Sequence, residues 1–329
     1  MSSREVIASV GAGRMGRGIA VVFAYAGHTV HLIDVKDRPP ADVDRLRTDA
    51  LKEIEATLKT LASLGMMAES AVAPIVARVR VVGLDGVAEA LKQADVIFEG
   101  VPETLDAKRH AFSVISRHAR PDAIVASTTS TILSDTLQAF VAPPGRFLNA
   151  HWLNPAYLVP LVELSPGKDT DPAATQKLKS LLERIGKVPV VCKASPGYIV
   201  PRIQALAMNE AARMVEEGVA SPEELDKAIK YGFGFRFAVL GLLEFIDWGG
   251  GDILYYASRY LTGALGSDRY AAPEIIERNM REGRIGLTTR QGFLDYEGRD
   301  LDAYRAERMK AFIGMLGFLD LVKPPVVEE

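Results

Sequence analysis

A glycine-rich segment near the N-terminus restricts the fold more than any other feature of this sequence. Residues 6–10 are mostly apolar (VIASV) and lead directly into GAGRMG at 11–16, which matches the pattern GxGxxG. Beyond it, apolar residues recur at a spacing of three or four and share one helix face; they are Met15, Ile19, Val22, Phe23 and Ala26. A strand, a glycine turn and a helix in this order predict the first unit of a Rossmann-type, doubly wound, mostly parallel sheet.

Each glycine of this segment has its own task in holding a dinucleotide. Gly11 permits the tight turn, and Gly13 lets the backbone approach a pyrophosphate. Gly16 lets the helix pack closely on the strand. The unpaired N–H groups at the start of the helix then attract the phosphates.

A second apolar run, residues 29–33, ends in Asp34. This position is near the expected spacing of about 20 residues for an acid that binds the ribose hydroxyls. A carboxylate here repels a 2′-phosphate, which favours NAD over NADP, although Lys36 and Arg38 weaken the preference slightly. The predicted NAD-binding residues of this region are Gly11, Ala12, Gly13, Arg14, Met15, Gly16 and Asp34.

The next stretch, residues 41–80, does not continue the strand pattern. Apolar residues recur at helical spacing up to Gly65, which predicts a long amphipathic helix, and a second helical stretch is expected around 70–77. The two predict a helical hairpin inserted into the α/β fold. Lys52 and Lys59 lie on its more polar faces, and the pattern by itself indicates solvent-exposed side chains.

Two later apolar runs, 95–99 and 123–126, are typical of further parallel strands. Ligands of a doubly wound sheet bind beyond the carboxyl ends of its strands. The residues after the first run, Val101, Glu103 and Lys108, are therefore predicted to meet the cofactor.

A series of hydroxyl-bearing residues, 127–131, follows the second of these runs. Such side chains can cap the helix expected at 132–139, because a hydroxyl oxygen accepts a hydrogen bond from the first helical N–H groups. They can equally hold a polar substrate at the strand end. The two roles are compatible, and the pattern leaves both open.

The segment 147–155 (FLNAHWLNP) contains His151. A strand, a turn at 154–155 and a returning strand at 161–164 would bring Glu163 back beside this histidine. A carboxylate there would fix the imidazole tautomer and stabilise the imidazolium, as expected of a general base that works near pH 7. A lone buried histidine is more often structural, so spacing alone leaves both roles open.

The C-terminal part is expected to be all-α. A short segment, SPG at 195–197, follows the last expected strand and is typical of a hinge. Helices are expected over 198–217, 244–262 and 272–282. We therefore expect a Rossmann domain over residues 1–194 and a helical domain over 195–329. So much apolar helix in a short domain favours burial against a second copy, which predicts a homodimer.

Composition excludes several other classes of protein. The net charge of −3 argues against a nucleic-acid-binding protein, which would show a basic excess. The single cysteine, Cys192, allows no internal disulfide and fits the reducing cytoplasm, where it serves as a small apolar residue. The five histidines have no metal-ligand spacing, so we expect no metal. No apolar signal core or membrane-spanning run is present, which predicts a cytoplasmic protein without a membrane partner. The last two residues, Glu328 and Glu329, are expected to be disordered.

Five segments together resemble the L-3-hydroxyacyl-CoA dehydrogenase family. They are GAGRMGRGIA (11–20), ADVIFEGVPETLDAKR (94–109), IVASTTSTI (124–132), AHWLNPAYLVPLVE (150–163) and SPGYIVPRI (195–203). They follow one another in the family's order along most of the chain, and taken together they are highly specific.

The resemblance implies roles for the matching residues. His151 matches the general base, which takes the proton of the 3-hydroxyl while a hydride leaves C3 for the nicotinamide. Glu163 matches the acid that orients and polarises this base. Ser130 and Asn154 match polar groups that hold the substrate and the base.

Other matches concern the two ligands. Glu103 and Lys108 match residues near the nicotinamide and its ribose. The helical hairpin matches an insertion that helps to bind coenzyme A, which makes Lys59 a candidate substrate contact. Homodimers of the family pair through the C-terminal domain.

The sequence also departs from the family pattern. Pro201 and Thr128 stand where the family usually has asparagine, and proline cannot donate a side-chain hydrogen bond. CoA-using members carry a Pro-Gly-Pro-like segment where this chain reads GFGFRF at 232–237. This segment and 157–160 are more similar to the branch that oxidises small free hydroxy acids, such as the gulonate dehydrogenases. Arg236 could then clamp a substrate carboxylate, or be an ordinary surface arginine.

The leading hypothesis is an NAD-dependent dehydrogenase that oxidises the 3-hydroxyl of a short-chain (S)-3-hydroxyacyl-CoA, as 3-hydroxybutyryl-CoA dehydrogenases do. An alternative is a CoA-independent dehydrogenase of a small free hydroxy acid. A protein of another class, a non-catalytic NAD-binding structural protein, would have no need for four site residues at family spacing. Those four are His151, Glu163, Ser130 and Asn154.

Overall fold

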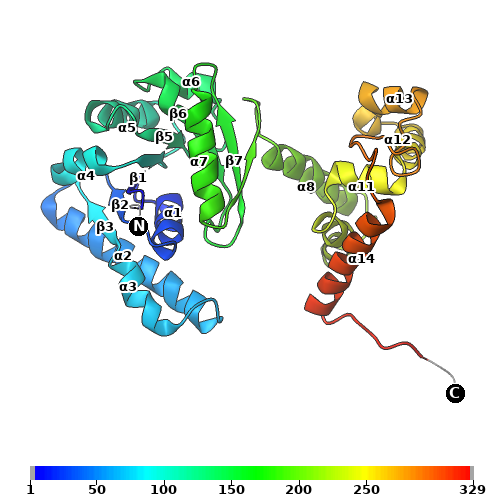
Figure 1. Ribbon diagram of the computed structural model, residues 1–329, viewed down its shortest axis with the longest axis horizontal. Helices are drawn as coiled ribbons and strands as arrows, with labels where there is room; N and C mark the ends of the chain where they lie inside the picture. The colour runs from blue at the N-terminus through cyan, green and yellow to red at the C-terminus, as the bar shows by residue number, and fades with distance from the viewer. Residues whose placement is uncertain (1–3, 327–329) are drawn as a thin grey trace. The chain divides into compact units, whose positions relative to one another are not determined.

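The computed structural model describes residues 4–326, so the acidic pair Glu328 and Glu329 lies outside the described range. The chain divides into two compact units, the first ending at Met208 and the second beginning at Asn209 (Figure 1). Within the described residues, no helix is both long and apolar enough to cross a membrane.

The division falls inside one helix, α8 (Val200–Glu216). The start of this helix belongs to the first unit because the N–H groups of Ile199 and Val200 hydrogen-bond to Glu163 there. The domain boundary expected at 194/195 lies before this point and stays a prediction.

The first unit contains one eight-stranded sheet with the order β3-β2-β1-β4-β5-β6-β7-β8. Its strands are β1 (Ile7–Val10), β2 (Val30–Ile33), β3 (Val79–Val82), β4 (Val96–Glu99), β5 (Ile124–Ser127), β6 (Phe147–Trp152), β7 (Leu161–Pro166) and β8 (Val188–Val191). All neighbouring strands are parallel except β6 and β7, which are antiparallel. The predicted doubly wound, mostly parallel sheet is confirmed.

Helices cover both faces of this sheet, as the apolar strands require. They are α1 (Arg14–Tyr25), α2 (Pro40–Ser63), α3 (Val72–Val76), α4 (Val87–Gln93), α5 (Leu105–His118), α6 (Ser134–Gln138) and α7 (Pro172–Arg184). Successive residues of β1 alternate between two cores: Ile7 joins the cluster with α1, α2 and α7, whereas Ala8 joins the cluster with α4 and α5. The first core contains a group of aromatic rings formed by Phe23, Phe98 and Trp152.

The predicted hairpin is present as α2, a short 3₁₀ turn η1 (Glu69–Ala71) and α3 (Figure 1). The long helix α2 buries one apolar stripe, formed by Ala50, Ile54, Leu58 and Leu61. Gly65, with φ +83°, lies just after the end of this helix. The second helical stretch, expected around 70–77, is a single short helix in the structure.

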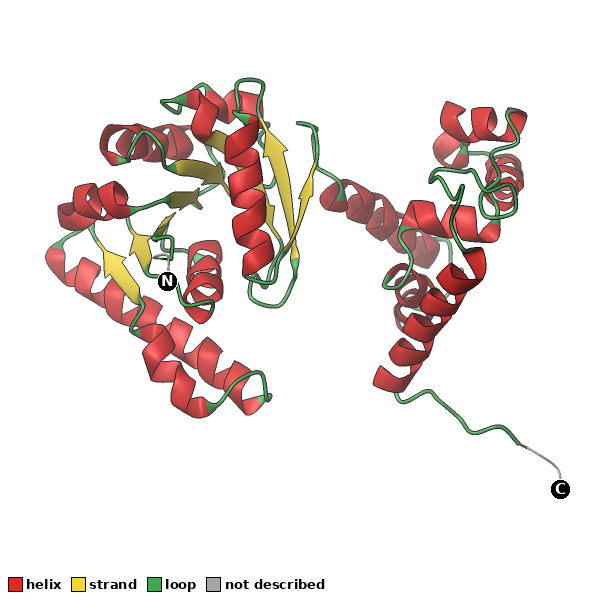
Figure 2. Ribbon diagram, in the orientation of Figure 1, coloured by secondary structure: helices red, strands yellow, loops and turns green. Residues whose placement is uncertain are grey.

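The second unit is helical, as expected, and its described residues, 209–326, contribute no strand to the sheet (Figure 2). After α8 come α9 (Pro222–Ala228), the π-helix η4 (Ile229–Gly234), α10 (Phe235–Phe237), α11 (Leu242–Gly249), α12 (Gly251–Leu265), η5 (Asp268–Tyr270), α13 (Glu274–Arg281) and α14 (Leu301–Phe318). The helix expected over 244–262 is two helices, because the chain bends at Gly250 with φ +106°. Helix α14 was not predicted, since its apolar residues do not gather on one face.

A buried carboxylate organises the loop between α13 and α14. Asp247 on α11 is 2% exposed and accepts hydrogen bonds from the N–H groups of Phe293 and Leu294, both at 2.8 Å. The hydroxyl of Tyr296 donates to the same carboxylate at 3.3 Å. One side chain of α11 thus fixes the path of the following loop.

Candidate active site

The glycine segment has the geometry that a dinucleotide requires. Gly11 has φ +110°, and a Cβ atom there would overlap the carbonyl group of Gly100 on the next strand end. A Cβ on Gly16 would overlap the carbonyl oxygen of Gly11. Around Gly13, in contrast, no described atom lies within 4 Å of the Cβ position. Gly11 and Gly16 are therefore packed tightly against the backbone, whereas the space beside Gly13 is open to an approaching pyrophosphate. This arrangement fits the binding of NAD.

A cavity of about 760 Å³ extends from this segment between the ends of β1, β2 and β4. It is lined by Gly11–Gly13, residues 34–38, residues 100–102, Leu46, Ala107 and His110. Asp34 lies in its wall, and its carboxylate accepts from Nε of Arg38 at 2.5 Å. The acid expected to bind the ribose therefore has a cationic neighbour within the same cavity. Of the other predicted cofactor contacts, Val101 lines this cavity.

Lys108 is placed differently from the prediction that it meets the cofactor. Its side chain is 1% exposed, and its ammonium lies 3.0 Å from both carboxylate oxygens of Glu99 and 3.2 Å from Glu103. The hydroxyl of Ser127, paired with Glu99 across β4 and β5, donates to the same carboxylate at 2.6 Å. Lys108 thus balances a buried charge, and direct contact with the cofactor stays a prediction.

Sequence reasoning missed Glu99 and Ser127. A signal for Glu99 was available, because a carboxylate in an apolar parallel strand must find a cationic partner.

Glu103 holds the hydroxyl-rich turn after β5. Its Oε1 accepts from the hydroxyls of Thr129 and Thr131 and from the N–H groups of Ser130 and Thr131. Partial burial raises the pKa of Glu103, but the hydrogen bond from Thr129, the charge of Lys108 and the hydrogen bond from Thr131 outweigh it and lower the pKa to about 2. Glu103 is therefore a fixed anion that shapes the 129–131 turn.

Ser130 itself is exposed on this turn. Within the described residues its hydroxyl makes no hydrogen bond, whereas the hydroxyl of Thr129 accepts from the N–H of Ile132 at 3.0 Å. The helix that follows, α6, begins at Ser134 without a side-chain cap, so the expected capping role of the 127–131 hydroxyls is wrong: Thr129 stabilises the turn before the helix. The Ser130 hydroxyl is available for a ligand.

His151 and Glu163 lie opposite each other on the antiparallel strands β6 and β7. Nδ1 of the imidazole is 2.8 Å from Oε2 of the carboxylate, and the two residues are 6% and 0% exposed. The other carboxylate oxygen, Oε1, accepts from the N–H groups of Ile199 at 2.9 Å and Val200 at 2.8 Å. The turn and returning strand expected from the sequence thus bring the two side chains together, and Nε2 of His151 makes no hydrogen bond to a described residue.

Tyr198, which sequence reasoning did not single out, lies against this pair. Its ring is parallel to the imidazole of His151, with 4.9 Å between centroids and an interplanar angle of 7°. Its hydroxyl donates to the carbonyl oxygen of Thr129 at 2.9 Å and accepts from the side-chain amide of Asn149 at 3.0 Å. Burial raises the pKa of this phenol well above its usual value, so Tyr198 is neutral at physiological pH.

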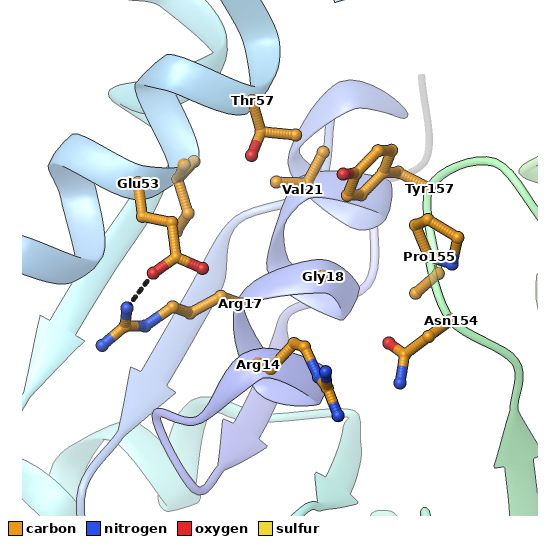
Figure 3. A pocket seen from close by; sticks show the side chains of 11 residues that line it. Arg14, Arg17, Gly18, Val21, Glu53, Thr57, Asn154, Pro155 and Tyr157 are labelled. Carbon is orange, nitrogen blue, oxygen red and sulfur yellow. Dashed lines mark hydrogen bonds and ion pairs between the residues drawn. The ribbon is translucent and has the colours of Figure 1, made fainter.

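Asn154 lines a second cavity of about 320 Å³ between α1, α2 and the β6–β7 connection. Figure 3 shows its side chain facing that of Arg14, with the ion pair of Arg17 and Glu53 farther along the wall and Tyr157 on the opposite side. Arg14 was predicted to contact NAD, but its side chain lines this second cavity. Among the described residues, its guanidinium has no ion-pair partner.

Two predicted substrate contacts lie elsewhere. Lys59 is 58% exposed on α2 and pairs with Glu55 at 2.6 Å, whereas the cavity wall from α2 consists of Glu53, Ile54 and Thr57. Arg236 in the second unit lies over the ring of Phe245, 5.1 Å from its centroid, and donates to the carbonyl oxygen of Gly232.

Two smaller expectations concern the segment around the end of the sheet. Burial, followed by the charge of Glu163, raises the pKa of the Cys192 thiol, which fits its interpretation as an unreactive residue. Pro201 is the second residue of α8, where a proline costs no intrahelical hydrogen bond.

Comparison with known families now adds to this geometry. Residues 6–195 match the model of the 3-hydroxyacyl-CoA dehydrogenase NAD binding domain, and residues 197–296 match that of the 3-hydroxyacyl-CoA dehydrogenase C-terminal domain. The chain belongs to the 3-hydroxyacyl-CoA dehydrogenase family. The resemblance noted in the sequence is confirmed.

Relatives of this family member differ in the substrates that their names describe. The chain is 32% identical over 315 residues to 5-formyl-3-hydroxy-2-methylpyridine 4-carboxylate 5-dehydrogenase of Mesorhizobium japonicum, covering 95% of this chain and 98% of that protein. It is 34% identical over 290 residues to 3-hydroxybutyryl-CoA dehydrogenase of Bradyrhizobium diazoefficiens, covering 88% and 94%.

Among solved structures, the 3-hydroxyacyl-CoA dehydrogenase of Archaeoglobus fulgidus superposes with a TM-score of 0.74. It has 30% sequence identity, and the match covers 97% of this chain and all of that one. These comparisons identify the chain as an NAD-dependent dehydrogenase that acts on a hydroxyl group.

Proposed function

We propose that this chain oxidises the 3-hydroxyl group of a short-chain (S)-3-hydroxyacyl-CoA to the 3-oxo compound, with His151 as the general base. The observation that carries the proposal is the 2.8 Å contact between Nδ1 of His151 and Glu163, which leaves Nε2 open to a substrate hydroxyl. NAD, when bound at the glycine segment, supplies the acceptor for the hydride that leaves C3.

Glu163 supports the proton transfer in two ways. With Nδ1–H donated to its Oε2, the imidazole carries its lone pair on Nε2, which takes the hydroxyl proton. The imidazolium formed in this step lies beside a carboxylate whose second oxygen is held by two backbone N–H groups. The carboxylate therefore keeps its place beside the imidazole while the proton moves.

We propose that two further side chains hold the substrate. The hydroxyl of Ser130 has no hydrogen bond to a described residue, and Glu103 fixes the turn that carries it. Asn154 lines the 320 Å³ cavity three residues after His151. We assign both to substrate binding.

The coenzyme A part of the proposal is supported by the hairpin and by one relative. The wall of the 320 Å³ cavity includes α2, the long helix of the inserted hairpin, so an acyl-CoA in this cavity would contact it. The relative from Bradyrhizobium is named for a CoA thioester substrate. Lys59 would have to leave Glu55 to contact the phosphates of coenzyme A.

A small free hydroxy acid is the second candidate substrate. The guanidinium of Arg14 faces Asn154 in this cavity without an ion-pair partner among the described residues, and it can bind a carboxylate through two hydrogen bonds. The relative from Mesorhizobium, matched over almost its whole length, is named for a pyridine carboxylate. Arg236 is the alternative carboxylate contact.

The experiment that tests the function is NADH oxidation by the pure protein with acetoacetyl-CoA and, separately, with acetoacetate. We expect turnover of the thioester and a loss of roughly 10²- to 10⁴-fold in the His151→Ala variant, as for removal of a general base. His118→Ala, a histidine at the end of α5, serves as the matched control. Turnover of acetoacetate alone would support the free-acid substrate, and an active His151→Ala variant would overturn the mechanism.

We also propose that the chain is a homodimer that pairs through its second unit. Large apolar side chains are exposed along α12 and α14; they are Ile253, Tyr256, Tyr260, Met309, Ile313 and Phe318. Light scattering after size exclusion should give twice the chain mass, and Tyr260→Glu should give the monomer. Leu64→Glu, at the equally exposed tip of the hairpin, should leave the dimer intact. A location in the reducing cytoplasm remains our expectation from Cys192.

A further inference from the structure

Three consecutive residues, Tyr198, Ile199 and Val200, contact both members of the His151–Glu163 pair. The ring of Tyr198 covers one face of the imidazole, with the two rings 7° from parallel. The N–H groups of the next two residues donate to Oε1 of Glu163. One short segment thus holds the histidine by its ring face and the carboxylate by its free oxygen.

The backbone is bent in a costly way to achieve this arrangement. Gly197 and Tyr198 both have positive φ, at +76° and +46°. Positive φ suits glycine but is unfavourable for an aromatic residue, and it persists only where the surroundings enforce it. Here the surroundings are the two hydrogen bonds of the Tyr198 hydroxyl, to Thr129 and Asn149, in a site where Tyr198 is only 6% exposed.

We propose that Tyr198 is a positioning residue that fixes the plane of the His151 imidazole for proton transfer. The inference rests on the proposed role of His151 as the base. The torsion that turns an imidazole about its Cβ–Cγ bond is broad, and one hydrogen bond at Nδ1 leaves the ring free to swing. A ring stacked at 4.9 Å removes this freedom on one side and aims Nε2 in one direction.

The hydroxyl of Tyr198 extends the arrangement to the substrate-binding turn. It donates to the carbonyl oxygen of Thr129, the residue before Ser130. Tyr198 therefore contacts both the imidazole of His151 and the turn that carries the Ser130 hydroxyl, although these two groups come from different strands. The ring of Tyr198 makes the stack on His151, and its hydroxyl sets the distance between His151 and the turn that carries Ser130.

Two variants separate these contributions. Tyr198→Leu removes the stack, and we expect kcat to fall roughly 10- to 100-fold, the range for a misplaced catalytic group. Tyr198→Phe keeps the ring and loses both hydrogen bonds of the hydroxyl, and we expect kcat to fall by less than about fivefold, because these neutral hydrogen bonds do not touch the reacting atoms. In both variants the Kd for NADH, measured by fluorescence, should stay unchanged, because no contact to the NAD-binding segment is lost. Tyr231→Leu, an exposed tyrosine of the second unit, is the matched control.

A spectroscopic measurement tests the geometry without any variant in the pair. The ring current of a stacked phenol shifts the His151 ring protons upfield, and this shift should be present in the wild-type protein and absent in Tyr198→Leu. Normal kcat in Tyr198→Leu, or equal losses in the Leu and Phe variants, would overturn the proposal. If Tyr198→Leu does not fold, a wild-type spectrum without the upfield shift would overturn it equally. An inactive His151→Ala with a fully active Tyr198→Leu would refute this inference alone and leave the proposed function standing.

Discussion

Glu99 and Lys108 form an ion pair that is closed to solvent, with side chains 0% and 1% exposed and 3.0 Å between the ammonium and each carboxylate oxygen. The same carboxylate accepts from the N–H of Val101 at 2.8 Å, so the pair also sets the path of the segment that lines the NAD cavity. Removing one partner would leave an uncompensated charge in the core.

We therefore predict that Lys108→Met lowers the free energy of unfolding by about 3–5 kcal/mol, as for other broken buried pairs. Urea unfolding, followed by a spectroscopic signal from the first unit, measures this free energy. The control Lys59→Met, whose ion pair is exposed, should change this free energy by less than about 1 kcal/mol. A double variant, Glu99→Leu with Lys108→Met, should recover most of the loss, and equal losses in the double and single variants would contradict the explanation.

The pairing of Asp34 with Arg38 leads to a prediction about coenzyme choice. In Asp34→Ala the carboxylate that repels a 2′-phosphate is gone, and the guanidinium of Arg38 is released to bind one. We expect the ratio of kcat/KM for NADP to that for NAD to rise by at least about tenfold, which corresponds to about 1.4 kcal/mol. Asp34→Ala with Arg38→Ala should lose most of this gain. An unchanged ratio in the single variant would show that Asp34 does not select the coenzyme.

Glu103 should make the stability of the first unit depend on pH. Its pKa is about 2 in the folded chain against an ordinary value of 4.5, because the hydrogen bond from Thr129 and the charge of Lys108 outweigh burial. A lowered pKa means that the stabilisation is present above pH 4.5 and is lost as the pH falls from 4.5 towards 2. The difference in unfolding free energy between wild type and Glu103→Gln should therefore shrink over this window.

Urea unfolding between pH 3 and 7 measures this difference, with Glu69→Gln on the hairpin as the control for a general charge effect. A difference that stays constant across the window, or one that Glu69→Gln reproduces, would contradict the assignment to Glu103.

The second unit offers a matched pair of glycines. A Cβ on Gly292 would overlap the carboxylate of Asp247, which holds the N–H groups of Phe293 and Leu294. We predict that Gly292→Ala lowers stability by about 1–3 kcal/mol, the usual cost of overpacking. Gly263→Ala, inside α12 with open space around it, should instead raise stability by about 0.5–1 kcal/mol.

Thermal unfolding compares the two variants, and hydrogen exchange at Phe293 and Leu294 locates the effect. Protection of these two amides in Gly292→Ala equal to the wild type would show that Asp247 had kept its place.

The parts of this fold that could be predicted are those that depend on residues close together in the sequence. The strand–glycine–helix order around Gly11 and the helical period of α2 are local, and each follows from backbone chemistry. The His151–Glu163 contact was also predictable, because a turn at Asn154 and a returning strand place the two residues in register. The local pattern predicted the approximate position of each helix and strand, but it predicted their first and last residues less well.

The remaining contacts depend on where distant segments meet. Tyr198 reaches His151 because the chain bends at Gly197 and Tyr198, which both have positive φ. The spacing of apolar residues does not predict such a bend. Lys108 was expected to contact the cofactor because it follows β4, but its ammonium is buried against Glu99, the last residue of that strand. The side chain of Arg14 lines the cavity beside Asn154, and only the arrangement of α1 against the β6–β7 connection shows this.

The strand pairing that joins His151 to Glu163 also has a consequence for how such a chain can diverge. Since the two residues face each other across paired strands, the length of the connection between them, residues 153–160, does not enter into their contact. Insertions and deletions there leave the pair intact, whereas a single inserted residue inside β6 or β7 would turn one side chain to the other face of the sheet. The same connection contributes Asn154 and Tyr157 to the 320 Å³ cavity. Changes in this loop can therefore alter which substrate the cavity accepts during evolution, while the His151–Glu163 pair that removes the hydroxyl proton is retained.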